Sequence, residues 1–102
     1  MNSVATYIQT LTNQVYKILP LAEEEAKGHD CHLHKYIDSI VLSMDGATRV
    51  FEPLGTNGSY LSVLCTLRGI DKTSDIKSLR GEILRCLKIL NFVGKQVGGD
   101  LY

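Results

Sequence analysis

The sequence of residues 76–97, IKSLRGEILRCLKILNFVGKQV, has the apolar spacing of an α-helix. Its apolar side chains recur at alternating intervals of three and four residues, which places them on one face of a helix. These seam residues are Ile76, Leu79, Ile83, Cys86, Leu90, Val93 and Val97. The spacing predicts a long amphipathic helix that begins at Thr73 or Ser74 and fades at Gly98 and Gly99.

Two earlier segments have the same periodicity. The first begins near Asn2 or Ser3 and ends at Lys27 and Gly28, since glycine suits the left-handed position after a helix. A proline inside a helix removes a hydrogen bond, so we expect a kink or break at Leu19–Pro20. The seam residues of this segment are Val4, Ile8, Leu11, Val15, Ile18 and Ala22.

The next helix is predicted to begin behind an Asp30 cap and to stop at Pro53. Residues 53–59 have the composition of a loop. A short helix is then expected from a Ser59 cap to Gly69. The apolar positions of these two helices are Leu33, Ile37, Ile40, Met44, Ala47 and Phe51, followed by Tyr60, Leu64 and Leu67.

These patterns predict an all-α fold, an antiparallel helical bundle of three long helices and one short helix. Strict period-two alternation, the signature of strands, extends nowhere beyond a few residues. The 102 residues are 44% hydrophobic and 22% charged, as is usual for a globular chain. Residues 1–102 are therefore expected to form a single helical-bundle domain, with consecutive helices antiparallel because their connections are short.

Charge and cysteine content limit the functional classes. The formal net charge is zero, which disfavours a protein whose main task is to coat nucleic acid or an anionic membrane. Residues 1–52 are nevertheless acidic on balance, and residues 53–102 are basic. The three cysteines, Cys31, Cys65 and Cys86, form no C-x-x-C pair, and Cys65 and Cys86 are expected in or near the core. With no secretory signal or membrane span in the sequence, a cytoplasmic location is expected.

The last helix is apolar around nearly its whole circumference. Leu84, Ile89 and Phe92 fall outside its seam when each residue is turned by about 100°, and Phe92 lies almost opposite the seam. A helix of this kind is usually buried on more than one side. We therefore expect a partner interface, or contact with a second copy, made by Leu84, Ile89 and Phe92 with Arg85 and Lys88 at its rim. The alternative is cover within the chain by the short helix, Leu54 and Tyr60.

This pattern predicts a non-enzymatic helical adaptor, inhibitor or regulatory subunit that acts by protein–protein interaction as a homo-oligomer, without a cofactor. An alternative is a subunit that binds nucleic acid or a nucleotide. Leu84 and Phe92 interleave with a basic stripe opposite the seam, and an aromatic side chain among cations can stack on bases. The residues of this stripe are Lys77, Arg80, Arg85, Lys88 and Lys95.

The sequence gives weaker support for a metal site or an anion-binding loop. Cys31, His34 and Asp38 share a helical stripe within or beside the His29–His34 cluster, but their spacing matches no established metal pattern. The three carboxylates of residues 23–25 point in three directions, which does not suit a magnesium site. Residues 55–59 resemble an anion-binding loop but lack the lysine and the preceding strand of a P-loop, so they are interpreted as a loop with a helix cap.

Overall fold

The computed structural model describes residues 3–29, 32–70 and 76–98. Within these ranges the chain forms helices and no strand. The helices are α1 (Ser3–Tyr16), α2 (Ile18–Ala26), α3 (Leu33–Val50), α4 (Glu52–Gly55), α5 (Gly58–Arg68) and α6 (Ile76–Gly98). The predicted all-α helical bundle is confirmed.

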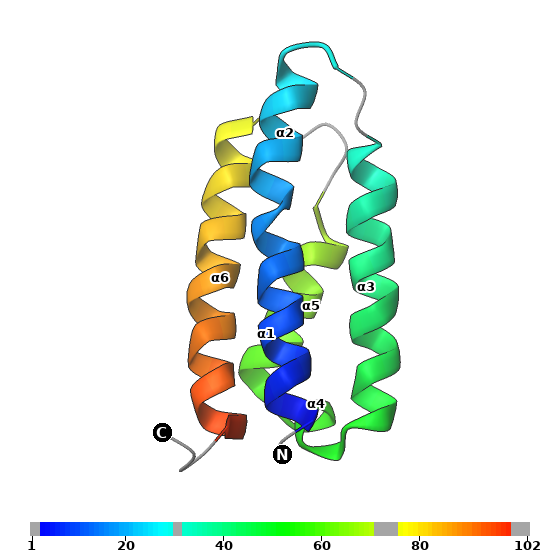
Figure 1. Cartoon of the computed structure of the whole chain (residues 1–102), viewed down its shortest axis with the longest axis vertical. Helices are drawn as coiled ribbons and strands as arrows, with labels where there is room; N and C mark the ends of the chain where they lie inside the picture. Colours follow the sequence, from blue (N-terminus) through cyan, green and yellow to red (C-terminus); the bar gives the residue numbers. More distant parts are fainter. Residues whose placement is uncertain (1–2, 30–31, 71–75, 99–102) are drawn as a thin grey trace.

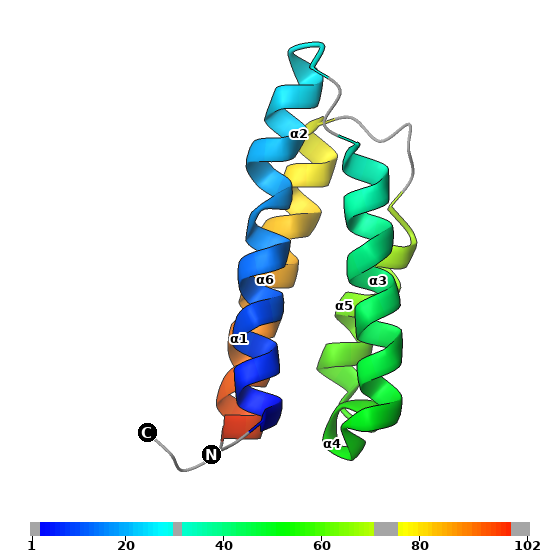
Figure 2. The same cartoon turned by 45° about the vertical axis from the view of Figure 1, so that its right-hand side comes forward.

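The helices run up and down in four arms (Figures 1 and 2). The first arm is α1 followed by α2, and α3, α5 and α6 form the other three, with each arm antiparallel to the one before it. α6 packs on α1, α2 and α5, whereas α3 packs on α1, α2, α4 and α5. α3 and α6 are therefore diagonal partners, and their outer faces look away from one another. The single-turn helix α4 was not predicted, because residues 53–59 were expected to be a loop.

The core is built from the predicted seams. Of the predicted seam residues whose side chains the structure describes, all but three are buried. Val4, Phe51 and Val97 are half-buried. The side chain of Ile76 lies outside the described residues. Cys86 is fully buried as expected, but the prediction for Cys65 is wrong, because Cys65 points away from the face that α5 buries. That face consists of Tyr60, Val63, Leu64 and Leu67.

The first arm breaks at Lys17, one turn before the predicted position. Pro20 has no N–H to donate to the carbonyl of Tyr16, and its ring would clash with that carbonyl in a continuous helix. The helix is therefore interrupted just after Tyr16 and resumes at Ile18. Pro20 then lies in the first turn of α2, where its missing N–H costs no helical hydrogen bond.

The turn between α2 and α3 is fixed by backbone and side-chain bonds. Gly28 takes a φ of 94°, and the amides of Gly28 and His29 donate to the carbonyls of Glu25 and Glu24 at 3.0 Å each. These two bonds make a Schellman ending, and Gly28 takes the left-handed conformation that was predicted for it. At the start of α3 the N-cap residue is His32, which makes no side-chain capping bond. Glu25 Oε1 instead accepts a hydrogen bond from the Leu33 amide at 3.2 Å. The predicted cap Asp30, like Asn2, Thr73, Ser74 and Gly99, lies outside the described residues.

α5 begins at a cap different from the predicted one. Asn57 Oδ1 accepts the Tyr60 amide at 2.9 Å, so Asn57 and not Ser59 caps this helix. Ser59 is already the second residue of α5. Asn57 Nδ2 also donates to Gln96 Oε1 at 3.1 Å, which ties the start of α5 to the end of α6.

Two glycines provide a matched test of this packing. A Cβ on Gly55 would lie 2.9 Å from the backbone oxygen of Thr48, where α4 turns back against α3. A Cβ on Gly46, within α3, would meet nothing within 4 Å. We expect Gly55→Ala to destabilise the fold, because backbone cannot move aside cheaply, and Gly46→Ala to stabilise it by about 0.5–1 kcal/mol. Thermal unfolding followed by circular dichroism measures both; a Gly55→Ala variant as stable as the wild type would contradict the described packing of α4.

Candidate functional site

The outer face of α6 carries two large apolar side chains in contact with solvent. Leu84 is 45% exposed and Phe92 is 52% exposed. Lys88 lies between them and is also exposed. Because residues four apart on a helix are neighbours, Leu84, Lys88 and Phe92 form one line along the helix surface. We call this line the α6 ridge.

The other two predicted interface residues are placed differently. Ile89 is half-buried and packs against the core. It lies two helical turns before Gln96, which bonds to Asn57 at the start of α5, so both residues lie on the side of α6 that faces α5. Arg85 is exposed and donates to Glu82 Oε2 at 2.6 Å. Leu84 and Phe92 are thus the open apolar positions of the predicted set, with Arg85 and Lys88 beside them.

Neither Leu54 nor Tyr60 covers the α6 ridge. Leu54 and Tyr60 are fully buried in the core, each at 0% exposure, and cannot lie over an outer face. α5 packs against α6, but it does so from the side that holds Ile89 and Gln96. Cover within one chain therefore fails for Leu84 and Phe92 among the residues described.

The face around the α6 ridge is cationic. α6 carries five Lys and Arg side chains and a single acidic one, Glu82. Arg80 pairs with Glu23 of α2 at 3.6 Å, and Arg85 pairs with Glu82. The remaining cations make no ion pair with any residue in the described ranges. They are Lys77, Lys88 and Lys95.

A groove of about 480 Å³ lies beside this face, between α1 and α6. The two helices approach closely where Gly94 faces Ile8, and a Cβ on Gly94 would lie 3.6 Å from Ile8 Cγ2. The groove is open and has no charged group other than Lys95 among its lining residues. Its lining is Ala5, Ile8, Gln9, Thr12, Asn13, Leu90, Asn91, Gly94 and Lys95. Among these lining residues, Lys95 has no carboxylate or imidazole beside it with which to form an acid–base pair.

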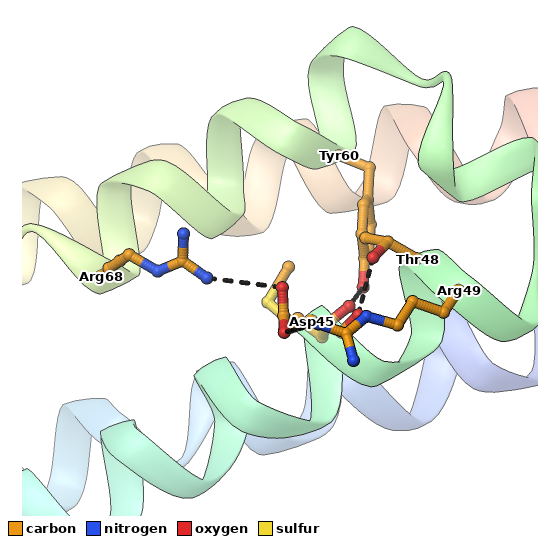
Figure 3. Close-up of polar contacts among 6 residues, drawn as sticks. Asp45, Thr48, Arg49, Tyr60 and Arg68 are labelled. Carbon is orange, nitrogen blue, oxygen red and sulfur yellow. Dashed lines mark hydrogen bonds and ion pairs between the residues drawn. The ribbon is translucent and has the colours of Figure 1, made fainter.

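A polar cluster joins α3 to α5 (Figure 3). Asp45 lies between Arg49 at 3.3 Å and Arg68 of α5 at 3.6 Å, and Tyr60 Oη donates to the carbonyl of Met44 at 2.9 Å. Burial raises the pKa of the Tyr60 hydroxyl far above its usual range, helped by Tyr7 and by the negative charge of Asp45. A buried phenol that stays protonated and donates to backbone holds two helices together; it is not poised for chemistry.

The structure also places the residues of the two metal-site hypotheses, the carboxylates of residues 23–25 and the group around His34. Glu23 binds Arg80, Glu24 binds Lys27 and His29, and Glu25 caps α3, so the three carboxylates diverge as predicted. No three His, Cys, Asp or Glu side chains converge as metal ligands within the described part of the chain. His34 and Asp38 lie on α3, but Cys31 lies outside the described residues, so the metal hypothesis for these three stays a prediction.

Comparisons of this chain with known protein families, with curated proteins and with solved structures found no match. Over the described ranges, no helix combines the length and the apolarity that crossing a bilayer requires.

The buried tyrosine predicts a loss of stability at alkaline pH. In the unfolded chain Tyr60 ionises near its ordinary pKa of 10.0, whereas in the fold burial raises its pKa. The folded state therefore keeps a proton that the unfolded state loses, and the free energy of unfolding falls as the pH rises above about 10. Cys86 adds to this loss of stability above about pH 9, because burial raises the pKa of its thiol to about 11.

We expect Tyr60→Phe to lower stability at neutral pH by about 1 kcal/mol, through the lost hydrogen bond, and to flatten the alkaline decline. Urea unfolding at a series of pH values measures both effects. An unchanged slope above pH 10 in the variant would show that Tyr60 does not contribute to the decline.

Proposed function

We propose that this protein is a non-enzymatic helical adaptor, inhibitor or regulatory subunit that binds protein through the outer face of α6 and associates with itself. The observation that carries this proposal is the α6 ridge, in which Leu84 and Phe92 are about half exposed on a helix whose opposite face fills the core. Large apolar side chains that lie together on a surface mark contact sites more often than isolated ones do.

The arrangement of the ridge has the chemistry of a protein interface. Aromatic and aliphatic anchors supply the free energy of binding when a partner removes them from water, at about 25 cal/mol per Å² of apolar surface. Cations around such anchors set orientation and partner choice more than affinity. Phe92 and Leu84 would serve as anchors, with Lys88 between them and Arg85 at the rim.

A cytoplasmic location belongs to the same proposal. Cys65 and Cys86 are free thiols, and the three cysteines of the chain cannot all be paired with one another. Free thiols, one of them exposed, suit a reducing compartment.

A photo-crosslinking amino acid at position 92, used in the native host, tests the proposal. We expect discrete adducts to protein from Phe92, and their loss when Leu84→Glu is added. The matched control places the same group at Thr10, an exposed residue of α1. Position 92 yielding no more adduct than position 10 would contradict a protein-binding face on α6.

The alternative function is contact with nucleic acid or a nucleotide through the basic stripe. It is favoured by the exposure of Lys77, Lys88 and Lys95, which make no ion pair within the described ranges. If the stripe bound nucleic acid, affinity would fall steeply with salt, and Lys88→Glu would weaken binding to all sequences alike. Fluorescence titration with a labelled oligonucleotide at low salt measures this. Under the protein-binding proposal, we expect no saturable binding at micromolar protein.

A further inference from the structure

A second exposed apolar line lies on α3, diagonal to α6. Leu42 is 73% exposed and Val50 is 75% exposed. Asp38, Leu42, Gly46 and Val50 follow one another at intervals of four, so they form one line along the outer surface of α3. We call this line the α3 ridge. Four of the five large exposed apolar side chains found in the described residues lie on the two ridges; the fifth is Tyr16.

The charge of α6 argues against two copies that meet through the same face. A two-fold axis through the α6 ridge would bring the two Lys88 ammonium groups together and would oppose two helices that each carry five cations and one carboxylate. Like charges placed face to face in this way oppose association. The α3 helix carries two Lys and Arg side chains and two Asp side chains, so its outer face presents no net charge to α6.

The two ridges also match residue by residue. Asp38 is exposed and makes no ion pair with any residue of the described chain, and the same is true of Lys88. Leu42 follows Asp38 by four residues, while Leu84 and Phe92 lie four residues to either side of Lys88. A contact that pairs Lys88 with Asp38 therefore brings Leu42 against Phe92 if the helices run parallel, or against Leu84 if they run antiparallel. One ion pair and one apolar pair form together in both orientations.

We propose that the second copy in the self-association lies with its α3 ridge on the α6 ridge of the first, in a head-to-tail contact. This inference deepens the proposed function and rests on it. α3 and α6 lie diagonally across the bundle (Figures 1 and 2), and each ridge lies on the side of its helix away from the buried seam. An open assembly of copies joined in this way therefore has one free ridge at each of its two ends. A heterologous contact of this kind grows into an open chain or closes as a ring. A single helix-on-helix contact is smaller than a standard interface, so association is weak and depends on concentration.

Sedimentation velocity of Phe92→Glu, Leu42→Glu and their mixture tests the proposal. Wild-type protein is expected to form species larger than a dimer as its concentration rises, and each variant alone is expected to stay monomeric. An equal mixture should form a dimer and nothing larger, because Phe92→Glu keeps its α3 ridge and Leu42→Glu keeps its α6 ridge. Both side chains are exposed, and far-ultraviolet circular dichroism verifies that the variants fold.

The charge pair provides an independent readout. Lys88→Asp and Asp38→Lys should each weaken association about two- to fivefold, the range for an exposed ion pair, and the double variant should regain most of the loss. Three results would overturn the head-to-tail contact: a monomeric wild type at all concentrations, a Leu42→Glu variant that associates like the wild type, or a mixture that stays monomeric. The crosslinking from position 92 would still decide separately whether α6 binds another protein.

Discussion

Each helix of this bundle can turn only one face to the core, and the rest of the structure follows from this constraint. The core is filled by single apolar stripes, such as Ile83, Leu90 and Val93 on α6 and Ile40 and Met44 on α3. Burial of these stripes is the main driving force that holds the arms together. A large apolar residue that falls outside the stripe of its helix is left in water unless a neighbouring helix covers it. Leu84 and Phe92 are such residues on α6, and Leu42 and Val50 are such residues on α3.

Polar side-chain contacts join neighbouring arms of the bundle. Asp45 with Arg68 joins α3 to α5, Glu23 with Arg80 joins α2 to α6, and Asn57 with Gln96 joins the start of α5 to the end of α6. These contacts are largely exposed, so each contributes little to stability beside the burial of the apolar stripes. The only large polar side chain in the described core is Tyr60, whose hydroxyl donates to the Met44 carbonyl. The exposed apolar side chains on which the proposed contacts rest lie on the outward side of α6 and α3.

Periodicity in the sequence predicts the four arms of the bundle and nearly all of their buried positions, because burial of one stripe is a property of each helix alone. Features that depend on neighbours were not predictable in this way. Ile89 and Phe92 both lie off the seam, but only the position of α5 decides that Ile89 is half-buried while Phe92 is open. Asn57 and Ser59 are equally good capping residue types two positions apart, and the single turn of α4 selects Asn57. The α3 ridge could have been found, since Leu42 and Val50 also fall outside the seam of their helix.

None of the residues that the structure describes covers the α6 ridge, and the proposed binding face depends on this. Methyl and aromatic NMR of the dilute protein with a soluble paramagnetic probe measures this directly. The probe should relax Leu84 and Phe92, which are about half exposed, less than the more exposed Leu42 but far more than Leu90 and Leu67, which the core should protect. Protection of Leu84 and Phe92 in the monomer, equal to that of Leu90, would show that the chain buries its own ridge and would remove the basis for a binding face.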